Sequence, residues 1–246
     1  MSATWRLIRS GEVAPTDAMA VDEALLAGDG PPTLRLYRWR PHGLSLGYFQ
    51  RHADFDAETF GREGIVIVRR LTGGGAILHA DEVTFSIVAP LSEPLFAGPV
   101  RRSYERVHAI LAKAIERCGA RAEPRGGRAL PSDEPGSKWC YSDSTDVDLV
   151  CGDRKLVGSA QRRTGGRVLH HGSIVIRAPR HAPETASLDA AGGETRPDVV
   201  EETIAATFAE SLAIELRPRE LSTSEASAAR DLAASRYADP AWTRWR

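Results

Sequence analysis

Three cysteines offer the chain its possible nucleophiles: Cys118, Cys140 and Cys151. Their odd number, the absence of a Cys-x-x-Cys pair and the lack of clustered histidines leave a disulfide framework and a zinc site unsupported. Cys118 lies on the apolar stripe of an amphipathic segment and Cys151 continues a strand alternation, so both are expected in the core. Cys140 lies outside any periodic segment and is predicted to be the accessible thiol. A reactive thiol needs positive charge nearby.

Lysine could supply that charge, and it is rare here. Of the 32 Lys and Arg residues only Lys113, Lys138 and Lys155 are lysine, which points mainly to genome composition. Lys155 lies just past a predicted turn at Gly152-Asp153 and precedes the small residues 158–160. A lysine there could stabilise charge on a carbonyl oxygen, or activate Cys140 if that loop folds over the hairpin. The alternative is a solvated turn lysine.

The densest motif is the run 69–79, Arg-Arg-Leu-Thr-Gly-Gly-Gly-Ala-Ile-Leu-His, between two predicted strands. Consecutive glycines permit positive φ angles and close approach of a ligand, and the two arginines suit a phosphate or carboxylate. The run is neither a Walker loop nor a dinucleotide-binding turn, and a plain hairpin loop is the alternative. His79, His170 and His171 are each candidates for a general base, although a single histidine is more often structural.

Hydrophobic periodicity predicts both helices and strands, without regular βαβ units. The expected helices span 16–27, 103–119, 198–216 and 224–236. The expected strands are 33–39 and 44–50, joined as a hairpin, then 65–68, 82–90, a hairpin over 146–161, and 167–176. The segment 179–197 is expected to be a loop or lid. This order favours an α+β fold, a mixed or largely antiparallel sheet with helices packed on it.

Composition narrows the class of protein. Hydrophobic residues make up 42% and charged residues 26%, typical of a globular chain, and a net charge of −1 argues against a general nucleic-acid binder. No apolar run approaches the roughly 20 residues that span a membrane, and no signal peptide is visible, so a cytoplasmic location is expected. The length predicts a single domain over residues 1–246, with a C-terminal helical tail at about 198–246.

Together these motifs resemble the catalytic domain shared by lipoate-protein ligases, octanoyltransferases and biotin ligases. The matching stretches follow one another along the chain and cover roughly residues 15–176: they are 18–26, 34–50, 69–87, 148–163 and 169–176. The resemblance implies a mixed β-sheet flanked by helices, similar to the class II synthetase and biotin-ligase core.

The resemblance also implies site residues. Gly73, Gly74, Gly75 and His79 would line a tunnel for a medium-length acyl chain, Lys155 would meet the acyl carbonyl, and Arg70 would lie at the nucleotide or carrier end. The matched stretches add further candidates for substrate binding: Gly158, Ser159, Ala160, His171 and Gly172.

Cys140, 15 residues before Lys155, resembles the acyl acceptor of the cysteine-dependent octanoyltransferases. The implied reaction moves octanoyl from acyl carrier protein to Cys140, then to a lysine of a lipoyl domain, in a 2-oxoacid dehydrogenase E2 or the glycine cleavage H protein. No cofactor or metal is expected, and His79 or His171 could accept the amine's proton. The alternatives are an ATP-dependent lipoate ligase, an amidotransferase between lipoyl domains, and a non-enzymatic acyl- or biotinyl-binding module.

Overall fold

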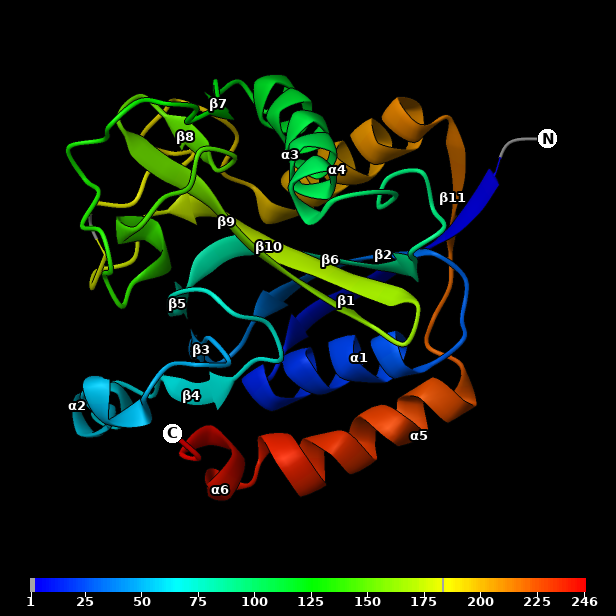
Figure 1. Cartoon of the computed structure of the whole chain (residues 1–246), viewed down its shortest axis with the longest axis horizontal. Coiled ribbons are helices and arrows are strands. Elements are labelled where there is room, and N and C mark those ends of the chain that lie inside the picture. Colours follow the sequence, from blue (N-terminus) through cyan, green and yellow to red (C-terminus); the bar gives the residue numbers. More distant parts are fainter. Residues whose placement is uncertain (1–2, 183) are drawn as a thin grey trace.

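An eight-stranded mixed sheet forms the centre of the protein (Figure 1). The computed structural model describes residues 3–182 and 184–246; Pro183, within the predicted loop 179–197, lies outside the described residues. The strand order is β11-β1-β2-β6-β10-β9-β8-β7, parallel from β11 to β2 and antiparallel beyond. The strands are β1 (Ala3–Val13), β2 (Thr33–Trp39), β6 (Asp81–Pro90), β7 (Glu123–Pro124), β8 (Leu149–Cys151), β9 (Arg154–Thr164), β10 (Arg167–Arg177) and β11 (Ile214–Pro218).

Helices cover both faces of this sheet (Figure 1). On one side lie α3 (Val100–Arg117) and α4 (Pro197–Leu212), and on the other α1 (Pro15–Ala27) and α5 (Thr223–Leu232). The largest apolar cluster lies beneath α3 and α4, and its buried members include Leu34, Leu36, Phe85, Ile87, Leu111 and Phe208. The period-2 pattern of β2 and β6 supplies the sheet side of this core. The predicted mixed sheet flanked by helices is therefore confirmed.

A separate three-stranded sheet carries the glycine run. Its order is β4-β3-β5, with β3 (Gly43–Leu46) between β4 (Val66–Arg69) and β5 (Ile77–His79). The prediction that 44–50 pairs with 33–39 in a hairpin was wrong, because Leu44 and Leu46 are buried in a different apolar cluster with Phe55, Phe60 and Ile65. The glycine run is not a plain hairpin loop either, since β4 and β5 each pair with β3.

The C-terminal segment combines helix and strand. The helix expected over 198–216 ends at Leu212, because Ala213 adopts a left-handed conformation with φ 52°, and β11 then extends the edge of the sheet beside β1. The predicted helical tail is therefore interrupted by a strand. After α5 come a π-helical turn (Ala233–Tyr237) and α6 (Pro240–Thr243). Pairing of β11 with β1 ties this segment to the central sheet and supports the single domain, which stays a prediction.

Candidate active site

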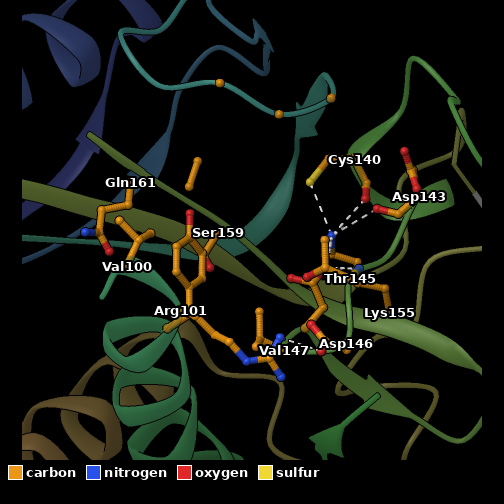
Figure 2. A pocket seen from close by; sticks show the side chains of 16 residues that line it. Val100, Arg101, Cys140, Asp143, Thr145, Asp146, Val147, Lys155, Ser159 and Gln161 are labelled. Carbon is orange, nitrogen blue, oxygen red and sulfur yellow. Dashed lines mark hydrogen bonds and ion pairs between the residues drawn. The ribbon is translucent and has the colours of Figure 1, made fainter. Parts of the chain in front are cut away.

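A cavity of about 530 Å³ brings together most of the residues that sequence analysis singled out (Figure 2). It lies between β9, the start of α3, the loop after Cys140 and the glycine run. Its lining includes Gly73, Gly74, Gly75, Tyr104, Cys140, Asp148, Lys155, Ser159 and Ala160. The structure therefore gathers segments more than 80 residues apart in sequence around one thiol.

The Cys140 segment is fastened to the end of the glycine run. The Cys140 amide donates a hydrogen bond of 2.9 Å to the carbonyl of Ala76, whose own amide donates to Lys138 over 2.8 Å. A Cβ at Gly75 would lie 2.6 Å from the Cys140 nitrogen, so this approach requires glycine. Cys140 then begins a 3₁₀ turn, Cys140–Ser142. Its side chain is 8% exposed, so the expected accessible thiol is buried at the cavity wall.

Lys155 lies directly beside Cys140 (Figure 2). Its Nζ donates to the Cys140 carbonyl at 2.9 Å, pairs with Asp148 Oδ2 at 2.9 Å and lies 3.6 Å from Cys140 Sγ. The residue is only 3% exposed, which excludes the solvated turn lysine. Burial alone lowers the pKa of Lys155, but the negative charges of Cys140 and Asp148 outweigh it and raise the pKa to about 12. The group stays an ammonium at neutral pH.

Two further glycines leave room around the sulfur. A Cβ at Gly158 would lie 3.2 Å from Cys140 Sγ, so any side chain there would crowd the thiol. A Cβ at Gly172 would lie 2.4 Å from the carbonyl oxygen of Gly158, a backbone atom that cannot move aside cheaply. Small residues at these positions therefore let β9 and β10 pass close beneath Cys140.

Arg70 holds the glycine run from inside. Its Nη2 donates to the carbonyl oxygens of Gly73 at 2.8 Å and Gly75 at 2.7 Å. Its Nη1 donates to the Ser45 carbonyl at 2.8 Å and to Ser45 Oγ at 3.2 Å, and its Nε donates to Thr72 Oγ1. All five N–H groups of the guanidinium thus have protein partners. Arg70 is buried and holds the glycine run with all of its donors, so none is directed at a nucleotide or carrier, and its expected place at that end stays a prediction.

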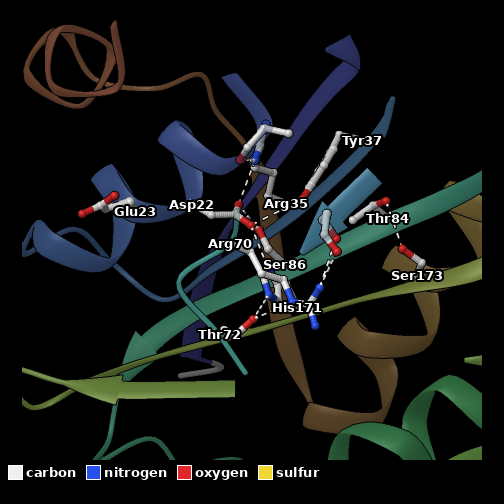
Figure 3. A network of polar contacts seen from close by, with 12 residues as sticks. Asp22, Glu23, Arg35, Tyr37, Arg70, Thr72, Thr84, Ser86, His171 and Ser173 are labelled. Atoms are coloured by element: carbon white, nitrogen blue, oxygen red, sulfur yellow. Dashed lines mark hydrogen bonds and ion pairs between the residues drawn. The ribbon is translucent and has the colours of Figure 1, made fainter. Parts of the chain in front are cut away.

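A second, narrow compartment lies next to the cavity and shares Ala160 with it. Its lining includes Tyr37, Trp39, Arg70, His79, His171 and Gly172. Figure 3 shows the polar network at its edge, where His171 meets Asp22 and Thr72. The narrow compartment is the buried part of the site, and the cavity of about 530 Å³ is its open part.

Two of the three candidate histidines, His79 and His171, belong to the buried part. The third, His170, is buried outside both compartments, with Nδ1 3.2 Å from Gln161 Oε1. His171 contacts Asp22 Oδ2 at 3.1 Å through Nδ1 and Thr72 Oγ1 at 2.7 Å through Nε2. Burial lowers the pKa of His171 even though Asp22 opposes the change. The ring of His79 stacks on Trp39, and its two nitrogens contact Glu82 and Ser45. Neither ring has a nitrogen available to the open cavity, so the geometry does not favour either as the proton acceptor.

Comparison with known proteins decides the family. Residues 14–191 match the family described as the lipoyl protein ligase A/B catalytic domain. The chain belongs to this family. It is 38% identical to Octanoyltransferase LipM of Moorella thermoacetica, over 99% of this chain and 98% of the relative. It is also 38% identical to Octanoyltransferase LipM of Kyrpidia tusciae, over 96% and 97% of the two chains.

Solved structures support the fold of the lipoyl protein ligase A/B family. A lipoate-protein ligase A bound with ATP superposes with a TM-score of 0.81 at 23% identity, covering 99% of both chains. A biotin protein ligase from Aquifex aeolicus gives a TM-score of 0.51 at 11% identity, over 85% of this chain and 70% of that one. The expected likeness to biotin ligases is thus confirmed at the level of the fold.

Sequence analysis of this family member missed Asp148 and Tyr104. Asp148 accepts from the Thr145 amide at 2.7 Å, which orients its carboxylate toward Lys155. Tyr104 lines the cavity from α3, and burial, helped by the charges of Asp148 and Cys140, raises its pKa to about 12. Asp148 has a local signal, since an acidic residue directly precedes a buried strand there, whereas Tyr104 falls at helical spacing with apolar residues and gives no sign that it faces a cavity.

Proposed function

We propose that the protein is an octanoyltransferase of protein lipoylation that works through a thioester on Cys140. Its relatives at 38% identity over nearly the whole chain are octanoyltransferases. The observation that carries the proposal is the contact of 3.6 Å between Lys155 Nζ and Cys140 Sγ at the wall of a cavity. A fixed ammonium beside a thiol favours the thiolate, the form that attacks a carbonyl.

In the first half-reaction the Cys140 thiolate attacks the carbonyl of an octanoyl thioester carried on acyl carrier protein. A carbon–sulfur bond to Cys140 forms, the bond to the carrier sulfur breaks, and the carrier thiol leaves. Lys155, or backbone amides near Gly75 and Gly158, would stabilise the oxyanion. The narrow compartment beyond Ala160, lined by His79, His171 and Gly172, has a volume of about 20 Å³ and would have to widen to receive the hydrocarbon tail.

In the second half-reaction a lysine amine of a lipoyl domain attacks the acyl-enzyme. An amide forms and Cys140 leaves as a thiolate beside Lys155. The acceptor would be the lipoyl domain of a 2-oxoacid dehydrogenase E2 or the glycine cleavage H protein. ATP is not required by this chemistry, because a thioester is already an activated acyl group. We place the reaction in the cytoplasm; among the described residues, no helix combines the length and apolar character that a membrane span requires.

Intact-protein mass spectrometry tests the proposal. After incubation with octanoyl acyl carrier protein, the wild type should gain about 126 Da, the mass of one octanoyl group bound through covalent catalysis. The Cys140→Ala variant should gain nothing and should transfer nothing to a lipoyl domain. A wild type without an adduct would refute the proposal.

The same protein separates the alternatives. A lipoate ligase would release AMP from ATP in the presence of lipoate, and Cys140→Ala would retain that activity. An amidotransferase would load Cys140 from an octanoylated lipoyl domain but not from acyl carrier protein. Solved ligases resemble the chain in fold alone, whereas the buried Lys155–Cys140 pair is a specific feature that favours thioester chemistry.

A further inference from the structure

Transfer from Cys140 to a lysine requires a base in the open cavity. The attacking amine must lose a proton as its bond to the carbonyl carbon forms. His79 and His171 line the buried compartment with both ring nitrogens engaged. Lys155 donates to the Cys140 carbonyl and to Asp148, and Asp148 is held by Lys155 and Thr145. Of the other carboxylates in the cavity lining, Asp146 pairs with Arg101 and Asp143 accepts from the Gly136 amide. A hydroxyl–imidazole pair on the same wall is the remaining candidate for the proton acceptor.

Ser159 and His108 form such a group. Ser159 lines the open cavity, and its Oγ lies 2.7 Å from Nε2 of His108 on α3. Nδ1 of the same ring lies 2.5 Å from the carbonyl oxygen of Val147. Because a carbonyl oxygen can only accept, Nδ1 carries the hydrogen and Nε2 offers its lone pair to the Ser159 hydroxyl. The arrangement is a hydroxyl, a base and a group that orients the base, pointing into the cavity of Cys140.

The surroundings keep the imidazole neutral and ready to accept a proton. Burial lowers the pKa of His108, the Val147 carbonyl and Asp148 oppose this, and Lys155 adds to it. Tyr104 of α3 and His170 of β10 contact the ring edge-on, with centroids 5.7 and 6.1 Å away. When the ring becomes an imidazolium, the Val147 carbonyl and the Asp148 carboxylate are the groups that stabilise it.

We propose that Ser159 is a catalytic residue of the second half-reaction, relaying the proton of the attacking amine to His108. The neutral amine forms a C–N bond to the thioester carbon while its proton passes to Ser159 Oγ. The hydroxyl proton of Ser159 moves to His108 Nε2, and the C–S bond breaks to leave the Cys140 thiolate beside Lys155. The imidazolium then releases its proton to water. This inference rests on the proposed octanoyl transfer.

The test follows the two half-reactions separately by single-turnover mass spectrometry. Ser159→Ala should load Cys140 with octanoyl within twofold of the wild-type rate. Its transfer of octanoyl to a lipoyl-domain lysine should slow by about 10²–10⁴-fold, the usual contribution of a general base. His108→Gln should show the same loss, and the double variant should lose no more than either single one, because the two residues act as a unit.

Two readouts separate proton relay from a structural role. In the wild type the transfer rate should fall at low pH as His108 becomes protonated, and Ser159→Ala should lack this limb. A small thiol at pH 9 attacks as a thiolate with no proton to give, so it should unload octanoyl-Cys140 equally well in both proteins. Thr207→Val, which removes a buried hydroxyl of α4 outside both compartments, is the matched control and should behave as wild type.

Three results would overturn the inference while leaving the proposed function intact. The first is transfer to the lysine by Ser159→Ala within threefold of the wild-type rate. The second is an equal loss with the thiol acceptor, which shows a structural role. The third is octanoyl on Ser159 in peptide mapping, which makes Ser159 an acyl acceptor. An absence of any octanoyl on wild-type Cys140 would overturn the proposed function as well.

Discussion

Replacing Lys155 by methionine removes the ammonium but keeps an unbranched side chain. At 3.6 Å and an effective dielectric constant near 20, the attraction between this ammonium and the Cys140 thiolate is roughly 4–5 kcal/mol. Removing one preorganised group that stabilises charge during the reaction usually costs about 10²–10³ in rate. Lys155→Met should therefore slow loading of Cys140 about 10²–10³-fold at pH 7.

The same substitution would leave the buried Asp148 carboxylate without its cation, which costs about 3–5 kcal/mol of folding free energy. A second variant separates this loss from the chemistry. Lys155→Met with Asp148→Asn removes both charges, so it should unfold at a temperature closer to the wild type yet load Cys140 as slowly as the single variant. The assays are thermal unfolding and the rate of octanoyl addition by mass spectrometry. Loading by the double variant within tenfold of the wild-type rate at pH 7 would refute the role assigned to Lys155.

Two predictions concern stability. Gly172→Ala should lower the free energy of unfolding by about 1–3 kcal/mol, because its Cβ would meet the Gly158 carbonyl. Gly127→Ala, with open space around the added Cβ, is the control and should be nearly neutral. Urea unfolding measures both variants, and equal effects would contradict the packing argument. Burial raises the pKa of Asp22, but His171 and Arg35 outweigh it and leave the pKa below its ordinary value. The stability that Asp22 contributes is therefore complete above the unfolded pKa of about 3.9 and is lost as the pH falls below it. When the urea midpoint of unfolding is measured from pH 6 to pH 2, Asp22→Asn should show a smaller decrease at low pH than the wild type. An equal decrease in both proteins would contradict this assignment.

Hydrophobic periodicity within a segment was enough to locate several helices and strands of the fold. The helix over 103–119 and the strands over 82–90 and 167–176 lie within a few residues of α3, β6 and β10. The turn at Gly152-Asp153 lies between β8 and β9 as expected. Strand pairing was harder to predict: Pro41 to Gly43 look like a hairpin turn, and nothing local shows that Leu44 will pack on Phe55 and Phe60 instead.

Pairing between strands that are distant in sequence could not be predicted either, because it leaves no local pattern. Strand β11 joins β1 across about 200 residues, and the helical pattern of α4 continued through the left-handed Ala213 that ends it. In the site, the contact between Cys140 and Lys155 was predicted only for the case that the loop of Cys140 folds over the hairpin of Lys155. The burial of Lys155 depends on Asp148, and the assignment of the base depends on which histidine contacts a hydroxyl of the cavity wall. Such facts come from packing and carry no local pattern.

The hydrogen bonds of Ala76 with Lys138 and Cys140 join the nucleophile to the glycine run, which Arg70 in turn fixes. A change in the glycine run would therefore also move the sulfur relative to Lys155. Gly73, Gly74 and Gly75 line the open cavity, whereas Met19 and Tyr37 line the narrow compartment. Substitutions at Met19 or Tyr37 should accordingly alter the room for a proposed acyl tail with less effect on the sulfur than changes in the glycine run.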